Sequence, residues 1–493
     1  DPHRPPDLKF DANAHEDAVI ESMKRLIAKA QQQPLTSEEA LQLAQALQVR
    51  QPWLEWADKR EKPWFMVEPV ALHIHERLSA QAILRAVQRQ PAQGDLFASP
   101  RLTPSQSYRY YEHDVDWSNR MILGDSLAVM SSLAIREEMK GKVQMIYLDP
   151  PYGIKFGSNF QPEVGKRDVK DKESDLTRQP EQVKAYRDTW QLGVHSYLSY
   201  LRDRLLIARD LLTDSGSLFV QISDENVHRV RCLLDEVFGA ENFVSLIHYT
   251  TAGSFTNKTI SRAGDFILWF AKNYETIKYH ELFICKKSPL DDVDSKYDQI
   301  EMPTGVRRGL TIDEKNGLTP LPEKSNIFRF DTIISSGYRT NTTIDFEVEG
   351  KKYHPGDNNN WKSTIEGMYR LANVNRIGIT SKGKLSYIRN FEDFPVVTIN
   401  SMWNDIGGAV QSRSDPKVFV VQTGLSVIQR CLLMTTDPGD LVLDPTCGGG
   451  TTAYVAEQWG RRWITVDTSR VAIALARQRL LTAAFDYYKV NEE

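Results

Sequence analysis

Val143-Gln144-Met145-Ile146-Tyr147-Leu148-Asp149-Pro150-Pro151-Tyr152 is the stretch around which the rest of this chain is organised. Its apolar run, from Val143 to Leu148, predicts a buried strand. The two prolines after the acid end that strand, because proline lacks the N–H that a sheet ladder needs. A carboxylate, a fixed backbone carbonyl and an aromatic ring are therefore expected just past a strand's carboxyl end, where open α/β sheets bind their ligands.

These three groups suit one kind of ligand. The Asp149 carboxylate and the Pro150 carbonyl can both accept hydrogen bonds from a single –NH₂ group. Tyr152 offers a flat face for a planar ring. Together they favour the exocyclic amine of a nucleobase, and a base in duplex DNA reaches such a pocket by flipping out of the helix. The alternative is a strand-terminating turn with a capping Asp.

The bulk properties of the chain exclude several classes of protein. Its 493 residues exceed one typical domain. A formal net charge of −4 argues against wholesale coating of nucleic acid, but it permits a local basic cleft. The four cysteines form no C-x-x-C pair, so neither a zinc site nor a disulfide framework is expected. No apolar run is long enough for a membrane span and no signal-peptide pattern is seen, so we expect a cytoplasmic protein without membrane contact.

The pattern of strand, acid and helix recurs along the chain. Asp125 follows the short apolar segment 120–123 and precedes a predicted helix over 126–133. Asp444 follows the predicted strand 441–443, and Asp467 follows the predicted strand 463–466. We expect all of these acids at one edge of the sheet. For Asp125 the alternative is simple helix capping.

The loop Asp444-Pro-Thr-Cys-Gly-Gly-Gly-Thr-Thr452 predicts a binding site for a nucleoside. Its glycines let the backbone approach a ligand, and the helix that follows offers free N–H groups. Asp467, roughly twenty residues on, is placed to take ribose hydroxyls. The loop is not G-x-G-x-x-G, and Asp444 would repel a pyrophosphate. A cationic nucleoside such as S-adenosylmethionine fits better than a dinucleotide.

Residues 1–115 are interpreted as a helical, polar region and linker. Helices are predicted from Thr36 and over 69–87, with an aromatic cluster packed between them: Trp53, Trp56, Trp64 and Phe65. The linker 91–104 contains Gln93-Gly94-Asp95-Leu96-Phe97, which resembles the clamp-binding peptides of bacterial replication and repair proteins. The alternative for this peptide is an apolar pair that docks the linker.

The middle of the chain alternates strands and helices. We predict a helix over 197–212, a turn at 214–216, a strand over 217–222, a helix to Phe238 and a strand over 266–270. This rhythm indicates a mainly parallel sheet. The charged stretch 166–178 is interpreted as a solvated loop that could order on DNA.

The rhythm breaks between residues 286 and 400. Basic residues interleave there with aromatic ones, a mixture that suits phosphate contact and groove reading. An ordinary insertion with a solvated face is the alternative. The candidate DNA-binding residues are Arg307, Arg308, Lys351, Lys352, Trp361 and Lys362.

The motifs resemble those of a known family, the amino-methyltransferases that modify adenine in DNA. Asp149-Pro-Pro-Tyr152 matches their catalytic D-P-P-Y, and Asp444–Thr452 matches their cofactor loop. The order of the two motifs, with an insertion between them, resembles the β class, which includes modification subunits of Type III restriction systems and phage-defence methyltransferases. The resemblance implies a Rossmann-like α/β sheet in permuted order. It divides the chain into catalytic segments, 116–285 and 401–493, around a target-recognition domain, 286–400.

The resemblance also assigns site residues. The catalytic set is Asp149, Pro150, Pro151 and Tyr152. The set expected to bind S-adenosylmethionine is Asp125, Asp444, Thr446, Cys447, Gly448, Gly450, Thr451, Asp467, Gln422 and Thr423. Thr446, Cys447 and Gly449 depart from the commonest loop residues, and the Lys of a Q-K-P-like stretch is absent after Gln422. No metal is expected.

The resulting hypothesis is methylation of adenine N6 in double-stranded DNA, for restriction-modification or phage defence in a prokaryotic cytoplasm and nucleoid. Methylation of cytosine N4 is the alternative within the class, although that subgroup more often begins its motif with Ser. A mainly sequence-reading subunit of a defence assembly is the alternative outside it. The absence of a catalytic Cys motif argues against methylation of a ring carbon. The resemblance allows a nuclease or helicase partner subunit and a homodimer.

Overall fold

A computed structural model of the chain describes the following residues: 6–9, 17–30, 35–37, 39, 53–57, 59–60, 67–72, 74–78, 117–152, 193–251, 260, 262–286, 296–380, 382–406, 418–419 and 422–485. The chain divides into two compact units. Unit 1 contains residues 1–282 and 400–493, and unit 2 contains Phe283–Ile399. Each unit is described by itself. No helix among the described residues has the length and apolar character needed to cross a bilayer.

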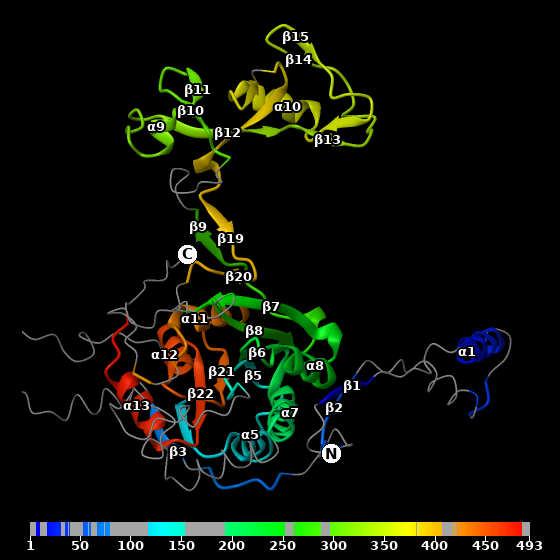
Figure 1. Cartoon of the computed structure of the whole chain (residues 1–493), viewed down its shortest axis with the longest axis vertical. Coiled ribbons are helices and arrows are strands. Elements are labelled where there is room, and N and C mark those ends of the chain that lie inside the picture. The colour runs from blue at the N-terminus through cyan, green and yellow to red at the C-terminus, as the bar shows by residue number, and fades with distance from the viewer. Residues whose placement is uncertain are drawn as a thin grey trace, which may run out of the picture. The chain divides into compact units, whose positions relative to one another are not determined.

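The core of unit 1 is a mixed sheet (Figure 1). Strand β5 is buried along its whole length and lies between β6 and β21, as its mainly apolar sequence predicts. The described strands run in the order β20 (Met402–Trp403), β7 (Phe243–Thr250), β8 (Gly264–Ala271), β6 (Leu212–Ile222), β5 (Val143–Leu148), β21 (Leu441–Asp444), β22 (Arg462–Asp467), β4 (Asn119–Leu123) and β3 (Ile74–Leu78).

The central strands of this sheet point the same way. Neighbours from β6 through β5, β21 and β22 to β4 pair in parallel, whereas β8 is antiparallel to both β6 and β7. The expected α/β fold is confirmed: the sheet is mixed, and most of its neighbouring strands pair in parallel as predicted. Because the parallel strands share a direction, the acids that follow β4, β5, β21 and β22 meet at one edge.

Helices cover both faces of the sheet (Figure 1). One face packs against α5 (Ser126–Ile135), α7 (Val194–Leu211) and α8 (Val227–Phe238), where alternate strand residues such as Ile146 and Leu148 join the main apolar core. The other face is covered by α11 (Leu425–Thr435), α12 (Thr451–Gln458) and α13 (Arg470–Leu481). Short 3₁₀ turns cover Ala240–Asn242 and Tyr274–Thr276.

The N-terminal prediction is partly wrong. The expected helix over 69–87 is a strand at Ile74–Leu78, which pairs antiparallel with β4 at the sheet edge. Before it, the Val70 amide donates to the Ser132 hydroxyl over 2.9 Å, so this segment runs along α5. Pairing with a distant strand overrode the local helical pattern. The other described elements here are β1 (Asp7–Lys9), α1 (Asp17–Ala30) and β2 (Trp53–Glu55).

Trp56 packs as predicted, but its neighbours belong to the main core. Its side chain is 5% exposed, and its indole N–H donates to the Ser199 hydroxyl of α7 over 2.8 Å. At Thr36, the side chain and backbone exchange hydrogen bonds with Glu39, as expected at a helix start. Trp64, Phe65, the linker with Gln93–Phe97 and the charged stretch 166–178 lie outside the described residues.

Two further details differ from the sequence prediction. The turn expected at 214–216 is part of β6, where the pairing with β5 shifts between Val143 and Met145. Strand β7 was not predicted. Its apolar residues do not alternate regularly with polar ones, so the period-2 signal of a strand is weak.

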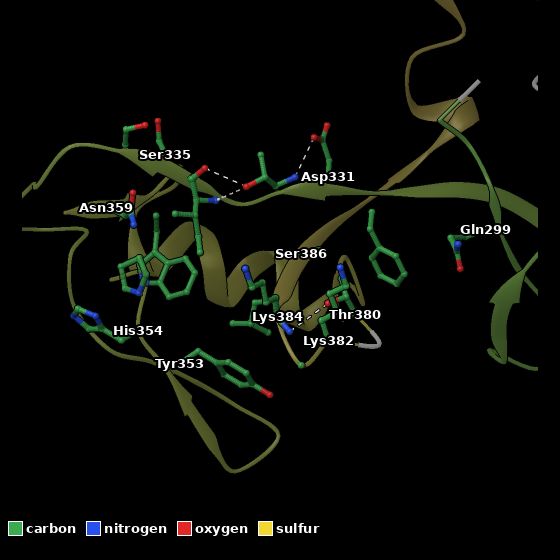
Figure 2. A pocket seen from close by; sticks show the side chains of 18 residues that line it. Gln299, Asp331, Ser335, Tyr353, His354, Asn359, Thr380, Lys382, Lys384 and Ser386 are labelled. Carbon is green, nitrogen blue, oxygen red and sulfur yellow. Dashed lines mark hydrogen bonds between the residues drawn. The ribbon is translucent and has the colours of Figure 1, made fainter. Parts of the chain in front are cut away.

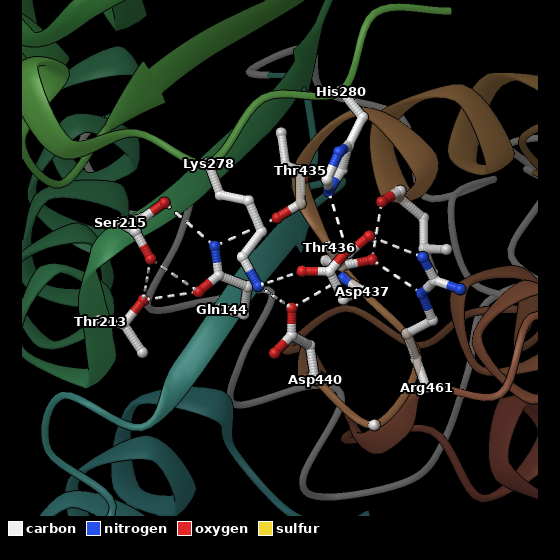
Figure 3. A network of polar contacts seen from close by, with 12 residues as sticks. Gln144, Thr213, Ser215, Lys278, His280, Thr435, Thr436, Asp437, Asp440 and Arg461 are labelled. Atoms are coloured by element: carbon white, nitrogen blue, oxygen red, sulfur yellow. Dashed lines mark hydrogen bonds and ion pairs between the residues drawn. The ribbon is translucent and has the colours of Figure 1, made fainter.

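A polar network ties the amino-terminal edge of the sheet together (Figure 3). The Gln144 amide donates to the carbonyls of Ser215 and Thr435, at 3.0 and 3.1 Å. Lys278 forms ion pairs with Asp437 and Asp440, at 2.8 and 2.6 Å. These contacts join the segments of unit 1 that precede and follow unit 2 in the sequence.

Unit 2 is built from short strands around its own small core. A five-stranded sheet runs in the order β11 (Arg307–Gly309), β10 (Gln299–Glu301), β12 (Asn326–Thr332), β18 (Leu385–Asn390) and β17 (Ile377–Ile379). The other elements are β9 (Phe283–Cys285), α9 (Ile312–Lys315), β13 (Ile334–Ser336), β14 (Phe346–Val348), β15 (Lys351–Tyr353), β16 (Asn359–Trp361), α10 (Ile365–Asn373), the 3₁₀ turn Phe391–Asp393 and β19 (Val396–Thr398). Phe346, Trp361 and Met368 are the centre of a buried cluster.

Candidate active site

Asp149, Pro150 and Tyr152 follow β5 at the carboxyl edge of the sheet, as predicted. Pro150 is buried, whereas Asp149 and Tyr152 are half-buried. The Tyr152 carbonyl accepts from the Asn226 side-chain amide over 2.8 Å, which fixes the backbone after the two prolines. The carboxylate, the Pro150 carbonyl and the phenol ring are thus held on one short segment.

Thr446 joins this segment to the loop after β21. Its hydroxyl accepts from the Asp149 backbone N–H over 2.9 Å and donates to the Asp444 carboxylate over 3.1 Å. The same Asp444 oxygen accepts from the Thr446 N–H over 2.8 Å. The two predicted motifs, nearly three hundred residues apart in sequence, therefore share one hydrogen-bond chain.

Burial shifts the titration of the edge carboxylates. Burial raises the pKa of Asp149 to about 7, and the Asp444 charge adds to that rise. Burial likewise raises the pKa of Asp444 and of Asp467 to about 6 each. None of the three forms an ion pair with a cation among the described residues. The site is therefore a cluster of carboxyl groups whose negative charge would be stabilised by a bound cation.

Asp467 ends β22 and holds the glycine loop. One oxygen accepts from the Gly448 N–H over 2.8 Å and the other from the Ser469 N–H over 2.7 Å. Cys447 is buried and its N–H donates to the Val466 carbonyl over 2.8 Å. Burial raises the pKa of the Cys447 thiol, so this side chain packs as a neutral group.

Gly450 begins α12 in the left-handed conformation, with φ of +72°. A Cβ atom built there would lie 2.7 Å from the Ala476 Cβ of α13. This glycine thus permits close packing of two helices, in addition to the ligand approach predicted from the sequence. Thr451, buried beside it, accepts from Arg479 over 3.0 Å.

Asp125 is both a helix cap and an ion-pair partner. One carboxylate oxygen accepts from the N–H groups of Leu127 and Ala128, at 3.0 and 3.2 Å. The other pairs with Arg204 of α7. The capping alternative is therefore confirmed for Asp125, whose side chain is still 44% exposed at the same sheet edge.

Gln422 and Thr423 lie close to the site, but their contacts differ. The side-chain oxygen of Gln422 accepts from the backbone N–H groups of Val418 and Phe419, which orders the segment next to the glycine loop. The Thr423 hydroxyl lies 3.3 Å from the Asp149 carboxylate and 3.0 Å from the Gln221 side-chain oxygen. Thr423 is thus placed at the predicted amine site.

Sequence reasoning missed Gln221, the penultimate residue of β6. It is 5% exposed, and its side-chain oxygen accepts from the Tyr147 hydroxyl over 2.6 Å. Its amide donates to the Tyr152 hydroxyl. A polar residue within the apolar run 218–222, close to the carboxyl end of the strand, was the signal that could have found it.

The predicted DNA-binding residues of unit 2 fall into two groups. Arg307 pairs with Glu301, and Arg308 forms a bidentate pair with the buried Glu314, so both arginines have partners within the unit. Trp361 is 2% exposed and its indole N–H donates to the Ile344 carbonyl, so it is a core residue without a free face for stacking. Three lysines are exposed: Lys351, Lys352 and Lys362.

Comparison with known families gives a match over most of the chain. The family model described as a DNA methylase, covering N6 and N4 enzymes, matches residues 143–478. This range contains β5 with the Asp-Pro-Pro-Tyr motif that follows it, unit 2 and the glycine loop. It ends within α13, at Gln478.

Individual relatives are similar at low identity. The probable type III restriction-modification enzyme HindVI Mod subunit of Haemophilus influenzae is 26% identical over 426 residues, which are 73% of this chain and 50% of that protein. The Type II methyltransferase M.EcaI of Enterobacter cloacae is 25% identical over 370 residues, 73% of this chain and 69% of that protein. The chain thus spans about half the length of the first of these relatives.

Proposed function

The chain belongs to the N6/N4 DNA methylase family, and from this premise we propose that it transfers a methyl group from S-adenosyl-L-methionine to adenine N6 in double-stranded DNA. The proposed setting is restriction-modification or phage defence in a prokaryotic cytoplasm. The HindVI relative is described as the Mod subunit of a probable type III restriction-modification enzyme, and M.EcaI as a Type II methyltransferase. A restriction subunit is the corresponding proposed partner.

One observation carries this proposal: the hydrogen-bond chain from Asp149 through Thr446 to Asp444. It places the amine-accepting motif directly beside the glycine loop. A group bound at the loop and an amine bound at Asp149 would therefore be neighbours. Such positioning is the main requirement of a direct transfer between two bound partners.

The residues at the sheet edge fit the cofactor. Asp149, Asp444 and Asp467 supply negative charge without a cationic partner among the described residues, which suits a ligand with a sulfonium and an ammonium group. Asp467 also holds the loop at the position where an acid can accept ribose hydroxyls. When bound, S-adenosyl-L-methionine supplies an electrophilic methyl group at its sulfonium.

The chain's own groups would prepare the amine. The adenine N6 lone pair is delocalised into the ring, so the free amine is a poor nucleophile. Asp149 and the Pro150 carbonyl accept its two N–H bonds, which favours a more tetrahedral nitrogen with an available lone pair. The Tyr152 ring would stack on the flipped base. The carboxylate that begins the motif supports adenine over cytosine, whose N4 enzymes more often begin with Ser.

Unit 2 is proposed to read the sequence around the target. The Asp149 pocket sees one flipped base and no neighbouring pairs, so another surface must read base edges. Unit 2 interrupts the catalytic sheet and carries exposed lysines with aromatic and amide side chains. Its assignment as a target-recognition domain stays a proposal.

The test is product analysis. Purified protein would be incubated with S-adenosyl-L-methionine and unmethylated genomic DNA, and the DNA digested to nucleosides for mass spectrometry. We expect N6-methyladenine from the wild-type protein and none from Asp149→Ala. Detection of N4-methylcytosine instead of N6-methyladenine would mean that cytosine, and not adenine, is the target base. DNA binding without any methylated base would favour a sequence-reading subunit instead.

A further inference from the structure

Unit 2 contains a pocket of about 950 Å³ that the sequence did not predict (Figure 2). Lys382 and Lys384 line it from the turn between β17 and β18. Hydrogen bonds within that turn, from the Thr380 N–H to the Lys384 carbonyl and from the Gly383 N–H to the Thr380 carbonyl, hold the two lysines in place. The volume suits a ligand larger than a single ion.

The pocket is positively charged because its lysines are unpaired. Neither Lys382 nor Lys384 forms an ion pair with a described residue. Asp331, which also lines the pocket, is already paired with Arg329 at 2.9 Å and lies 3.5 Å from Arg389. The acid is therefore neutralised inside the unit, and the two lysines remain available for an anionic ligand.

The rest of the lining can recognise flat polar groups. Tyr353 ends β15 and His354 follows it, and Ser335 and Asn359 lie on the paired strands β13 and β16 (Figure 2). The His354 Nδ1 accepts from the Gly356 N–H over 3.1 Å, so the neutral ring carries its proton on Nε2 as a donor. The buried Asn360 donates to the Gly337 carbonyl over 2.6 Å and fixes this wall.

We propose that this pocket binds DNA, with Lys382 and Lys384 on backbone phosphates and the Ser335, His354 and Asn359 wall toward the bases. The inference rests on the proposed function and specifies its DNA contact within unit 2. Polyanion binding needs unpaired cations, and base reading needs donors and acceptors on a rigid wall. The pocket combines both.

The experiment compares two double variants of the full chain that carry the same change in charge. Lys382→Glu/Lys384→Glu alters the pocket. Lys315→Glu/Lys324→Glu alters two exposed lysines of unit 2 that do not line it. Binding to a fluorescent duplex would be followed by anisotropy across a salt series, with cofactor affinity from calorimetry as a check on folding.

We expect the pocket variant to bind DNA at least about tenfold more weakly and to reduce the salt dependence by about two phosphate contacts. The control pair should change affinity much less. Equal losses in both variants, or none in either, would overturn the pocket assignment. Methylation by the wild-type protein is scored separately, so the pocket can fail while the proposed activity stands, and the reverse.

Discussion

The backbone N–H of Asp149 donates to the Thr446 hydroxyl over 2.9 Å, and that hydroxyl donates in turn to Asp444. Thr446→Val keeps the shape of the side chain but removes both bonds. We expect a loss of about 1–3 kcal/mol in the free energy of unfolding, since the Asp149 N–H loses its hydroxyl acceptor and the buried Asp444 carboxylate loses one of its donors. Methyl transfer should slow more than cofactor binding weakens.

Thr446→Ser is the control for this variant, because it restores the hydroxyl. Urea unfolding and single-turnover rates would be measured for both. If the valine and serine variants behave alike, the hydroxyl does not couple the two motifs.

Removal of the Asp149 side chain should abolish the chemistry. Asp149→Ala is expected to slow methyl transfer by at least about 10²-fold, the scale of losing a hydrogen-bonding group that acts in the transition state. Cofactor affinity by calorimetry should stay within a few-fold of wild type, because the carboxylate faces the target amine. If the variant retains more than a few per cent of the wild-type rate, the assignment of Asp149 as the acceptor of the target amine is wrong.

The raised pKa values predict an unusual pH dependence of stability. Asp149 titrates at about 7 in the folded chain, and Asp444 and Asp467 at about 6, whereas exposed Asp titrates near 4. The folded state therefore binds more protons than the unfolded state between about pH 4 and about pH 7. Stability from these groups is complete below about pH 4 and is lost as the pH rises through 6 to 7.

Scanning calorimetry of the cofactor-free protein at pH 5.5 and pH 8 measures this effect. Asp444→Asn should reduce the fall in Tm between the two conditions. The control Asp313→Asn, which changes an exposed carboxyl group, should leave that fall unchanged. Equal slopes in both variants would show that the buried carboxyl does not govern the dependence.

Gly450 predicts a steric effect on the cofactor loop. Gly450→Ala should weaken cofactor binding and lower Tm, because the new Cβ would lie 2.7 Å from the Ala476 Cβ. Gly141→Ala is the matched control, since Gly141 also has a positive φ, of +67°, but open space around it. Adding Ala476→Gly should recover part of the loss at Gly450. No recovery would mean that backbone strain alone is responsible.

Arg339 is the arginine of unit 2 that we predict to read a base. Among the described arginines of this unit, Arg339 and Arg370 alone form no ion pair, and Arg339 follows the wall strand β13. Arg339→Ala should relax one position of the methylated site, at about 1–3 kcal/mol. Modification-sensitive sequencing of methylated genomic DNA would show which position of the methylated site accepts additional bases. Arg308→Ala should instead destabilise unit 2 and leave the site unchanged, because Arg308 pairs with Glu314.

Much of unit 1 could be predicted because its strands are short apolar runs that end at Asp. The runs before Asp149, Asp444 and Asp467 are all strands of the central sheet. The edge strand β3 could not be predicted, since Ile74-His-Glu-Arg-Leu78 is compatible with either periodicity and its pairing with β4 decides the outcome. Gln221 was missed because its partners Tyr147 and Thr423 lie 74 and 202 residues away.

The base of unit 2 has an evolutionary consequence. Strands β9 and β19 pair antiparallel, with Phe283 opposite Thr398, so the chain enters and leaves this unit at adjacent points. Recombination at two short sites in a gene would therefore exchange the whole unit and leave the sheet with its carboxylates intact. If unit 2 reads DNA as proposed, lineages can acquire a new recognition sequence in one event while the chemistry is inherited unchanged.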